Sequence, residues 1–342
     1  MTPESPSRGT SPERRFLWTF VVTAVAGCML ISLLNVIVNP LGYYPTHVLR
    51  PLTWSSRGLK VKLMRDGRPA SILVIGSSRT MKMAPREIEQ LTGQTAFNAS
   101  IDAARVEDDL SMLTFAIDDM KWPVREVALG LDLEAFHDHV AADPRNASVP
   151  ELRDHLPLVT RLELVEDVAR SSLTLGQTLE SVRSVLLARA GYPAEKAVFD
   201  ADGYLHYLDW EKAVRDGTFK MSPNIAEYSA HLDGFTAIDR DRLALFDALL
   251  DRAQTHGIRV RAFLTPLQGD LLKHLESSPR FSALRRQLVD EMRRRVGRYA
   301  GFSFDDFTEV GAFGGSNELF FDGVHVREEN AHELVRSLWA VR

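Results

Sequence analysis

A serine and a distant carboxylate–imidazole pair have the types and spacing needed for nucleophilic catalysis. The turn Gly76-Ser77-Ser78 directly follows a short apolar run, and Asp322 and His325 lie three residues apart near the C-terminus. A hydroxyl becomes an effective nucleophile when an imidazole takes its proton and a carboxylate orients that imidazole. The sequence therefore suggests Ser78 as the nucleophile, His325 as the base and Asp322 as the orienting carboxylate.

These residues need a strand and two helices to position them. Residues 71–75 are a continuous, β-branched apolar run, typical of a buried parallel strand, and Gly76 ends it. Backbone N–H groups at the start of a following helix bind anions, so the attacking hydroxyl and an oxyanion donor would come from one turn. After His325, apolar residues with helical spacing predict a last helix; these are Ala331, Leu334, Val335 and Leu338.

The chain beyond residue 70 alternates predicted strands and helices. Five strands are expected, at about 71–75, 95–98, 126–131, 258–264 and 302–304. The helix expected around 106–117 carries Glu107, Asp108 and Asp109 on the face opposite its apolar residues. Strands separated by helices predict an α/β fold with a doubly wound parallel sheet, in which ligands bind beyond the carboxyl ends of the strands.

The pattern divides the chain into four segments. Residues 1–15 are interpreted as a cytoplasmic tail, 16–38 as a transmembrane helix, 39–69 as a juxtamembrane linker and 70–342 as the α/β domain. Within that domain the alternation stops at about 136–236, which we interpret as a mostly helical insertion. Its aromatic residues Tyr204, Tyr207 and Trp210 suggest a lid or a substrate-binding region.

The apolar segment 16–38 contains no charged residue and is long enough to span a hydrocarbon core of roughly 30 Å. Arg14 and Arg15 precede it. By the positive-inside tendency they hold the N-terminus in the cytoplasm of a bacterial cell and send the C-terminal domain to the periplasm or outside. Alternatively, residues 25–28 form a lipoprotein processing site that leaves Cys28 as a lipid-bearing N-terminus. Against this alternative, the residues after Cys28 stay apolar.

The composition excludes several classes of function. The net charge is −5, which disfavours a nucleic acid partner. Cys28 is the only cysteine, so disulfides, thiolate metal sites and cysteine nucleophiles are excluded outside the membrane. His137 and His139 flank Asp138, a spacing that a solvated loop explains better than a metal site. We expect no cofactor and no metal.

Together the motifs resemble those of the SGNH, or GDSL-like, hydrolase superfamily, over about residues 70–135 and 238–342. The segment 320–325, Phe-Phe-Asp-Gly-Val-His, is similar to the family's terminal Asp-x-x-His block, and Gly-Ser-Ser at 76–78 is similar to its Gly-Asp-Ser block. The resemblance implies a flavodoxin-like sheet of order 2-1-3-4-5. It also makes Ser78, rather than Ser77, the nucleophile.

The resemblance further implies an oxyanion hole. Asn98-Ala-Ser100 aligns with the family's Asn-x-Gly block, so the backbone N–H groups of Ser78 and Ser100 are its implied donors. The family's Gly-x-Asn block falls on Gly130-Leu-Asp132, which has a carboxylate in place of the amide, and an ionised Asp132 offers no donor. Two hypotheses follow: Asp132 is protonated in an apolar pocket, or it pairs with Arg79 at the neighbouring strand end, which we favour. In the second case, replacing Asp132 with Asn is expected to leave Arg79 free to approach the oxyanion.

Two functions remain open. Gly-Ser-Ser followed by a charged residue is similar to the motif of a membrane-anchored relative that assists D-alanylation of teichoic acids, and alginate O-acetylation proteins are further relatives. The resemblance implies a membrane-anchored, envelope-facing serine esterase or O-acyltransferase that acts on acyl esters of a cell-envelope polysaccharide. The alternative is a catalytically inactive SGNH-like protein that binds polysaccharide or scaffolds a membrane-bound acyltransferase. Asp132 favours the alternative, whereas Ser78, Asp322 and His325 favour the enzyme.

Overall fold

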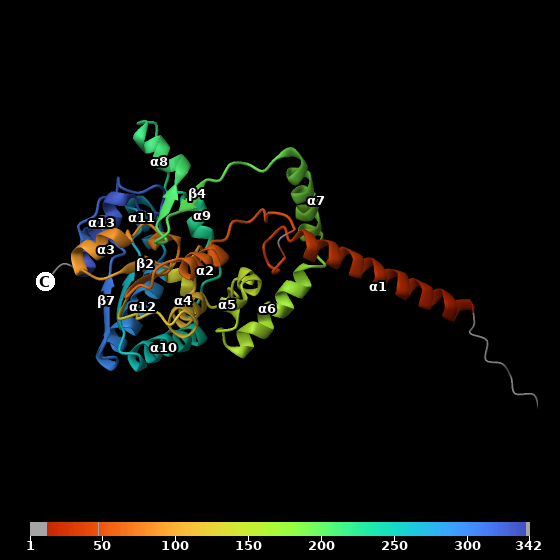
Figure 1. Ribbon diagram of the computed structural model, residues 1–342, viewed down its shortest axis with the longest axis horizontal. Helices are drawn as coiled ribbons and strands as arrows, with labels where there is room; N and C mark the ends of the chain where they lie inside the picture. Colours follow the sequence, from red (N-terminus) through yellow and green to blue (C-terminus); the bar gives the residue numbers. More distant parts are fainter. Residues whose placement is uncertain (1–11, 47, 340–342) are drawn as a thin grey trace, which may run out of the picture.

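The computed structural model describes residues 12–46 and 48–339. An α/β domain is built around a five-stranded sheet, in which every pairing is parallel and the strand order is β2-β1-β3-β6-β7. Helices cover both faces of this sheet (Figure 1). The strands of the sheet are β1 (Ile72–Ile75), β2 (Ala96–Asn98), β3 (Glu126–Leu131), β6 (Arg259–Leu264) and β7 (Phe302–Asp306).

The remaining elements are helices and one small hairpin. The hairpin consists of β4 (Ala197–Phe199) and β5 (Leu205–Tyr207), which pair antiparallel. The helices are α1 (Pro12–Val38), α2 (Arg57–Asp66), α3 (Pro85–Thr92), α4 (Val106–Thr114), α5 (Pro150–Arg153), α6 (Leu158–Ser171), α7 (Leu175–Ala190), α8 (Leu208–Arg215), α9 (Ile225–Ala230), α10 (Arg240–Thr255), α11 (Gly269–Glu276), α12 (Pro279–Arg298) and α13 (Glu328–Trp339).

The prediction of an α/β fold with a parallel sheet is confirmed. All five expected strands are present, with bounds that differ from the expected ones by at most two residues. Helix α11 and the β4–β5 hairpin were not expected. The range 39–69, expected to be a linker, contains α2, whose Lys60, Val61 and Met64 are buried in the domain. Most of the expected cytoplasmic tail, residues 1–11, lies outside the described residues.

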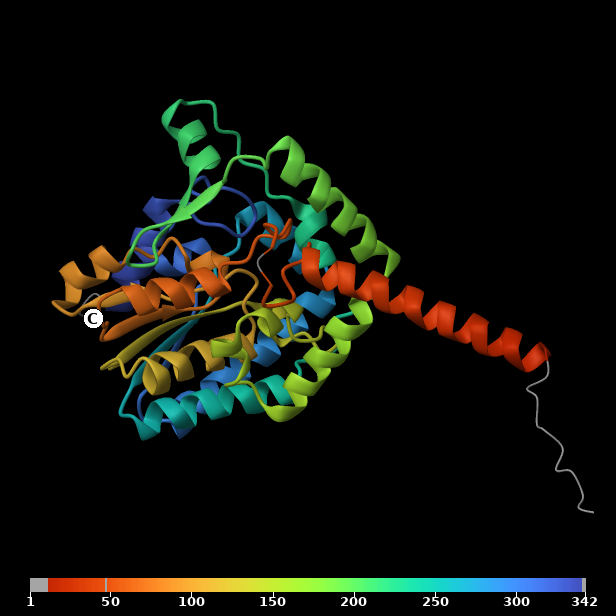
Figure 2. The same ribbon diagram turned by 45° about the vertical axis from the view of Figure 1, so that its right-hand side comes forward.

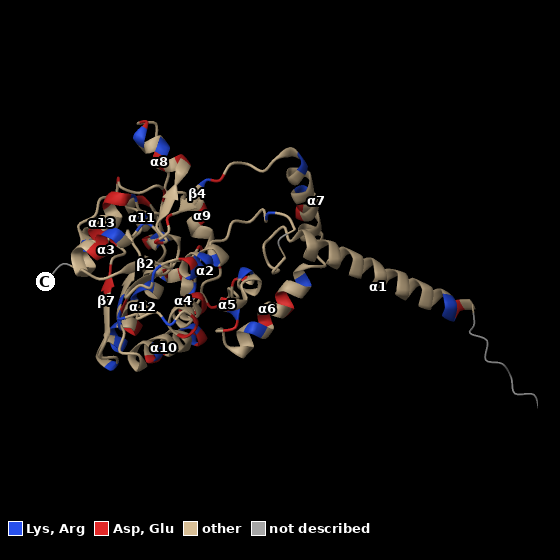
Figure 3. Cartoon of the chain, in the orientation of Figure 1, with Lys and Arg blue, Asp and Glu red and all other residues tan. Residues whose placement is uncertain are grey.

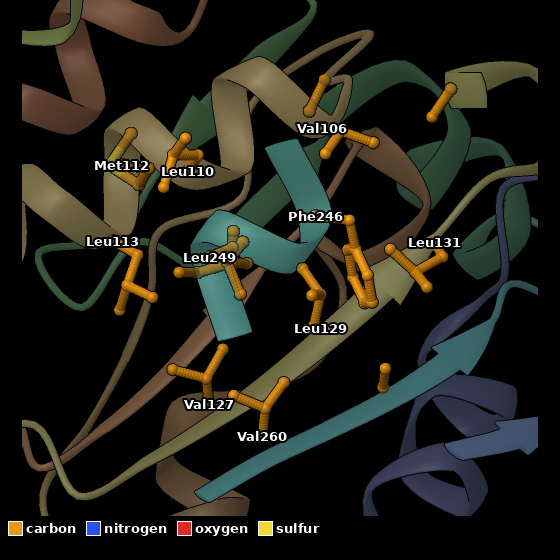
Figure 4. Packing of buried hydrophobic residues seen from close by; sticks show 14 of the residues in the cluster. Val106, Leu110, Met112, Leu113, Val127, Leu129, Leu131, Phe246, Leu249 and Val260 are labelled. Atoms are coloured by element: carbon orange, nitrogen blue, oxygen red, sulfur yellow. The ribbon is translucent and has the colours of Figure 1, made fainter. Parts of the chain in front are cut away.

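The sheet has an apolar core on each face because its central strands are buried on both sides. Figure 4 shows Val127 and Leu129 of β3 directed toward α4 and α10, where Leu110 and Phe246 pack against them. The opposite face is covered by α3 and α13, with residues such as Leu334 at its centre. The carboxyl ends of β1 and β3 therefore lie at one edge of a rigid two-sided core.

The acidic face expected on α4 is not exposed to solvent. Glu107, Asp108 and Asp109 are all buried, because α2 and α10 cover this side of the helix. Two of the three carboxylates have cationic partners: Arg57 lies 3.0 Å from Asp108, and Arg242 lies 3.1 Å from Glu107. The third, Asp109, has an Oδ1 atom without a hydrogen-bond partner among the described residues.

The first helix, α1, projects from the domain (Figure 2). It has a mean hydropathy of 2.4 over its most apolar window, of which 11% is buried. Its charged residues lie at its N-terminal end (Figure 3). Its length and composition fit a membrane span, and an N-terminal signal sequence would meet the same criteria. Cys28 lies within this helix and is exposed.

Replacing Arg57 tests how much the buried ion pairs hold α2 in place. Arg57→Met leaves the Asp108 carboxylate buried without its cation, which should lower the free energy of unfolding by about 3–5 kcal/mol. Lys62→Met on the same helix is the control, because Lys62 is exposed and its pair with Asp66 should contribute less than about 0.5 kcal/mol. Urea unfolding of the full chain in detergent micelles measures both. Equal decreases in the free energy of unfolding for the two variants would contradict a stabilising role for the buried Arg57 ion pairs.

Asp109 should make stability depend on pH in a defined direction. Burial, followed by the charges of Asp108 and Asp132, raises the pKa of Asp109 well above its usual value. The folded state therefore keeps a proton that the unfolded state releases, and stability falls as pH rises above the unfolded pKa of about 3.9. Asp109→Asn should raise the melting temperature at pH 7 but not at pH 4. A variant with the same gain at both pH values would contradict this.

Candidate active site

Ser78, His325 and Asp322 form one continuous chain of hydrogen bonds. Ser78 Oγ lies 2.8 Å from His325 Nε2, and His325 Nδ1 lies 2.8 Å from Asp322 Oδ2. Ser78 begins a short 3-10 helix, η1 (Ser78–Thr80), directly after β1, while Asp322 and His325 lie in the loop before α13. The structure thus brings together the three residues that the sequence proposed as nucleophile, base and orienting carboxylate.

Two glycines allow this approach. Gly76 has φ of 141°, a conformation that side-chain-bearing residues rarely adopt. A Cβ atom at Gly76 would lie 2.6 Å from the carbonyl oxygen of Gly130, and one at Gly130 would overlap the Thr80 methyl group. The carboxyl ends of β1 and β3 and the start of η1 therefore fit together only with glycine at both positions, which fixes where Ser78 begins its turn.

The environment of Asp322 determines the tautomer of His325. Burial opposes ionisation of this carboxyl, but hydrogen bonds and charge from His325, with backbone donors from Val324 and His325, outweigh burial and lower its pKa to about 2. At neutral pH Asp322 is therefore ionised and only accepts hydrogen bonds. Nδ1 of His325 must carry the proton, which leaves the Nε2 lone pair free to accept the proton of Ser78.

Tyr228 is a fourth member of the site that the sequence did not reveal. Its hydroxyl donates to Asp322 Oδ2 at 2.7 Å from helix α9, inside the insertion. Burial, followed by the charge of Asp322, raises the pKa of Tyr228, so its phenol stays protonated and remains a donor. No sequence motif marks this tyrosine, because its role depends on the folding of the insertion over the loop that holds Asp322.

The neighbouring serines have other roles. Ser77 is the N-cap of η1, and its Oγ accepts a hydrogen bond from the backbone N–H of Arg79 at 3.2 Å. Ser100 is fully buried, and its backbone N–H already donates to Asn98 Oδ1 at 3.1 Å. The implied oxyanion donor at Ser100 is therefore occupied in this geometry. Ser78 N–H, at the first position of η1, has no hydrogen-bond acceptor among the described residues.

Asp132 lies at the end of β3 and accepts a hydrogen bond there. Its Oδ1 accepts a hydrogen bond from Thr265 Oγ1 at 2.6 Å and lies 3.5 Å from Arg79 Nη1, so the expected ion pair is present. The sequence missed a second carboxylate, Glu134, which also pairs with Arg79. Because two carboxylates hold the Arg79 guanidinium, replacing Asp132 alone would not release it toward an oxyanion, contrary to our expectation from the sequence.

The insertion places aromatic rings beside the imidazole. The ring centroids of Tyr207 and Trp210 lie 5.8 Å and 5.9 Å from that of His325, and Trp210 stacks on Phe321 at 5.2 Å. Two buried lysines hold the β4–β5 hairpin in place by donating to backbone carbonyls. Lys60 Nζ lies 2.5 Å from Gly203 O, and Lys82 Nζ lies 3.2 Å from Leu205 O.

A polar groove of about 540 Å³ begins at this aromatic cluster. Phe321 forms its apolar end, and α8 and α13 supply charged side chains along its length. The charged residues are Lys82, Glu211, Arg215, Arg327, Glu328, Glu329, His332 and Glu333. An aromatic face next to many hydrogen-bonding groups suits a polar ligand with an apolar face.

The histidines at 137 and 139 lie in different environments. His139 is exposed, as expected for a solvated loop, but His137 is buried, stacks on Phe235 at 4.7 Å and contacts Asp233 O at 3.0 Å. The solvated-loop interpretation is therefore wrong for His137, because the end of the insertion covers it. Among the described residues, no group of three or more His, Cys, Asp or Glu side chains is arranged to hold a metal ion.

Comparison with models of known protein families gives no match, and a search of curated proteins finds no similar sequence.

Removing the Tyr228 hydroxyl should weaken the site without unfolding it. Tyr228→Phe deletes a hydrogen bond to a charged carboxylate, an interaction of about 1.5–3 kcal/mol, so reaction of Ser78 with a phosphonate probe should slow by about tenfold. Tyr204→Phe is the matched control, because the Tyr204 hydroxyl is buried without a partner among the described residues. Equal rates for the two variants would show that Tyr228 does not orient Asp322.

Proposed function

We propose that this protein is a membrane-anchored serine esterase or O-acyltransferase of the SGNH type, which acts on acyl esters of a cell-envelope polysaccharide. The observation that carries the proposal is the chain of hydrogen bonds from Ser78 through His325 to Asp322, with both links at 2.8 Å. Such a chain needs three residues from two distant segments to meet in one orientation, which a purely structural loop does not require.

The proposed reaction has two steps. Ser78 Oγ attacks the acyl carbonyl carbon while His325 Nε2 accepts the hydroxyl proton, and the Ser78 N–H donates to the developing oxyanion. The bond from the carbonyl carbon to the alcohol oxygen then breaks, and His325 returns the proton to that oxygen. In the second step water or a sugar hydroxyl attacks the carbonyl carbon of acyl-Ser78 while His325 Nε2 accepts its proton. The bond from that carbon to Ser78 Oγ then breaks, and His325 returns the proton to Ser78 Oγ. Asp322 orients and stabilises the imidazolium throughout.

The surroundings of the triad support this class of substrate. Numbered within the parallel sheet alone, the strand order is 2-1-3-4-5, the order that the superfamily resemblance implies. Trp210, which is half-buried and stacks on the buried Phe321, offers an apolar ring to the C–H face of a sugar, and the charged groups of the adjoining groove can bind its hydroxyls. An anchor at α1 would place the domain next to the envelope, with the orientation set by Arg14 and Arg15.

One arrangement favours a second candidate function, a non-catalytic protein that binds polysaccharide or scaffolds a membrane-bound acyltransferase. Asp132 accepts rather than donates, Arg79 is held by two carboxylates, and the Ser100 N–H is occupied. In this geometry the Ser78 N–H is the donor to the oxyanion, and a further donor would have to move into place when substrate binds. Loss of one oxyanion donor typically costs about 10²–10³ in turnover, so slow catalysis remains compatible with this site.

Covalent labelling distinguishes the two functions. The full chain in detergent micelles is incubated with a fluorophosphonate, and mass spectrometry locates the adduct. We expect the adduct on Ser78, and we expect His325→Ala to slow labelling by at least about 10³-fold with an unchanged melting temperature. Ser77→Ala is the matched control for the adjacent hydroxyl and should label as the wild type does.

The outcomes separate clearly. Equal labelling of the wild type and Ser78→Ala would remove Ser78 as the nucleophile, and an adduct on Ser77 would shift the nucleophile by one residue. If the wild type neither reacts with the probe nor releases acetate from acetylated sugar oligomers, the binding function replaces the enzymatic one.

A further inference from the structure

Helix α7 buries polar residues and exposes large apolar ones, the reverse of the pattern in a water-soluble domain. The buried residues of α7 are polar, namely Gln177, Ser181 and Ser184. The opposite face carries large apolar residues that are 50–74% exposed: Leu175, Leu179, Val182 and Leu186. Helix α6 adds a second exposed apolar strip, 60–67% exposed, formed by Leu158, Val159, Leu162 and Val165. Exposed apolar surface of this extent marks an interaction site.

The polar face of α7 and the turn that precedes it meet the end of α1. Asn35, fully buried near the C-terminus of α1, donates from Nδ2 to Ser172 O and to Thr178 Oγ1, each at 2.9 Å. Its Oδ1 accepts a hydrogen bond from Ser181 Oγ at 2.7 Å. Ser32 and Ser172 hydroxyls add a fourth contact at 2.8 Å. Helices surrounded by lipid pack in this way, with hydrogen bonds between polar side chains at their contacts and apolar residues on their outer surfaces.

Helices α6 and α7 expose apolar residues on the same side of the molecule as α1. Exposed apolar residues of α1 extend down to Ile37, next to the polar junction with the α6–α7 hairpin. Figures 1 and 2 show α6 and α7 on either side of the base of α1, on the side of the domain from which α1 projects. A bilayer crossed by α1 would therefore meet the outer faces of α6 and α7 at its surface.

We propose that α6 and α7 are seated in the membrane interface, with their exposed leucines and valines among the lipid chains, and that Asn35 fixes them to the transmembrane helix. The occupant of the apolar face is the bilayer itself. Four arginines balance four acidic residues over 158–190, so the attraction is apolar and needs no anionic lipid. The junction also makes α1 a retained part of the fold, because its removal would leave Ser172, Thr178 and Ser181 without their Asn35 partner.

Lipid-borne quenchers test this seating. Single-cysteine variants Leu162→Cys and Leu179→Cys are made in a Cys28→Ser background, labelled with bimane, and the full chain is reconstituted in zwitterionic phosphatidylcholine vesicles. Arg294→Cys on α12 is the matched control, because its side chain is exposed and lies outside the α6–α7 hairpin. We expect nitroxide-bearing lipids to quench both hairpin labels at least about threefold more than the control, and aqueous iodide to show the reverse order.

Each other outcome overturns the proposal. Iodide quenching of the hairpin labels equal to that of Arg294→Cys would mean that the face lies in water. Protection from both quenchers would mean that protein, a second copy or another chain, covers it. Asn35→Leu should lower lipid quenching at Leu179→Cys, whereas Leu30→Ile on exposed α1 surface should not. The readout is independent of the proposed acyl transfer, because Ser78→Ala should leave it unchanged.

Discussion

The approach of β1 to β3 at two glycines is the constraint on which the site depends. Because no side chain fits at Gly76 or Gly130, the chain must turn at the end of β1 and begin η1 at Ser78. That turn aims the hydroxyl away from the sheet and toward the loop before α13. The same approach brings Arg79 beside Asp132, so the position of Ser78 and the Arg79–Asp132 ion pair share one geometric cause.

The insertion contributes residues to this site. It supplies Tyr228, which completes the hydrogen bonds to Asp322, and the aromatic residues beside His325. Two buried lysines connect it to the α/β core, because Lys60 and Lys82 donate to backbone carbonyls of the β4–β5 hairpin. A buried polar group that loses its hydrogen-bond partner is destabilising, so misplacement of the hairpin would be costly. The position of the hairpin, and with it the shape of the groove, is therefore tightly specified.

The buried polar groups of the α/β domain differ in kind from those between α1 and α7. In the α/β domain, the buried carboxylates of Asp108 and Glu107 on α4 pair with arginines. In α7, neutral hydroxyls and amides are buried and leucines face outward. The first pattern suits a domain surrounded by water, and the second suits helices next to lipid. The boundary between them lies at the junction of α1 with α7, about Asn35.

The sequence by itself determined the parallel strands, the order of strands and helices, the apolar first helix and the three residues of the Ser78, His325 and Asp322 chain. These follow from local periodicity and from the rule that strand ends in such sheets carry functional residues. Only the tertiary structure decided the roles of Tyr228, Glu134 and Ser100, the burial of the α4 carboxylates and the inverted faces of α7. Each of these depends on which side chains from distant segments pack against a given surface. A local sequence pattern does not show which segments those are.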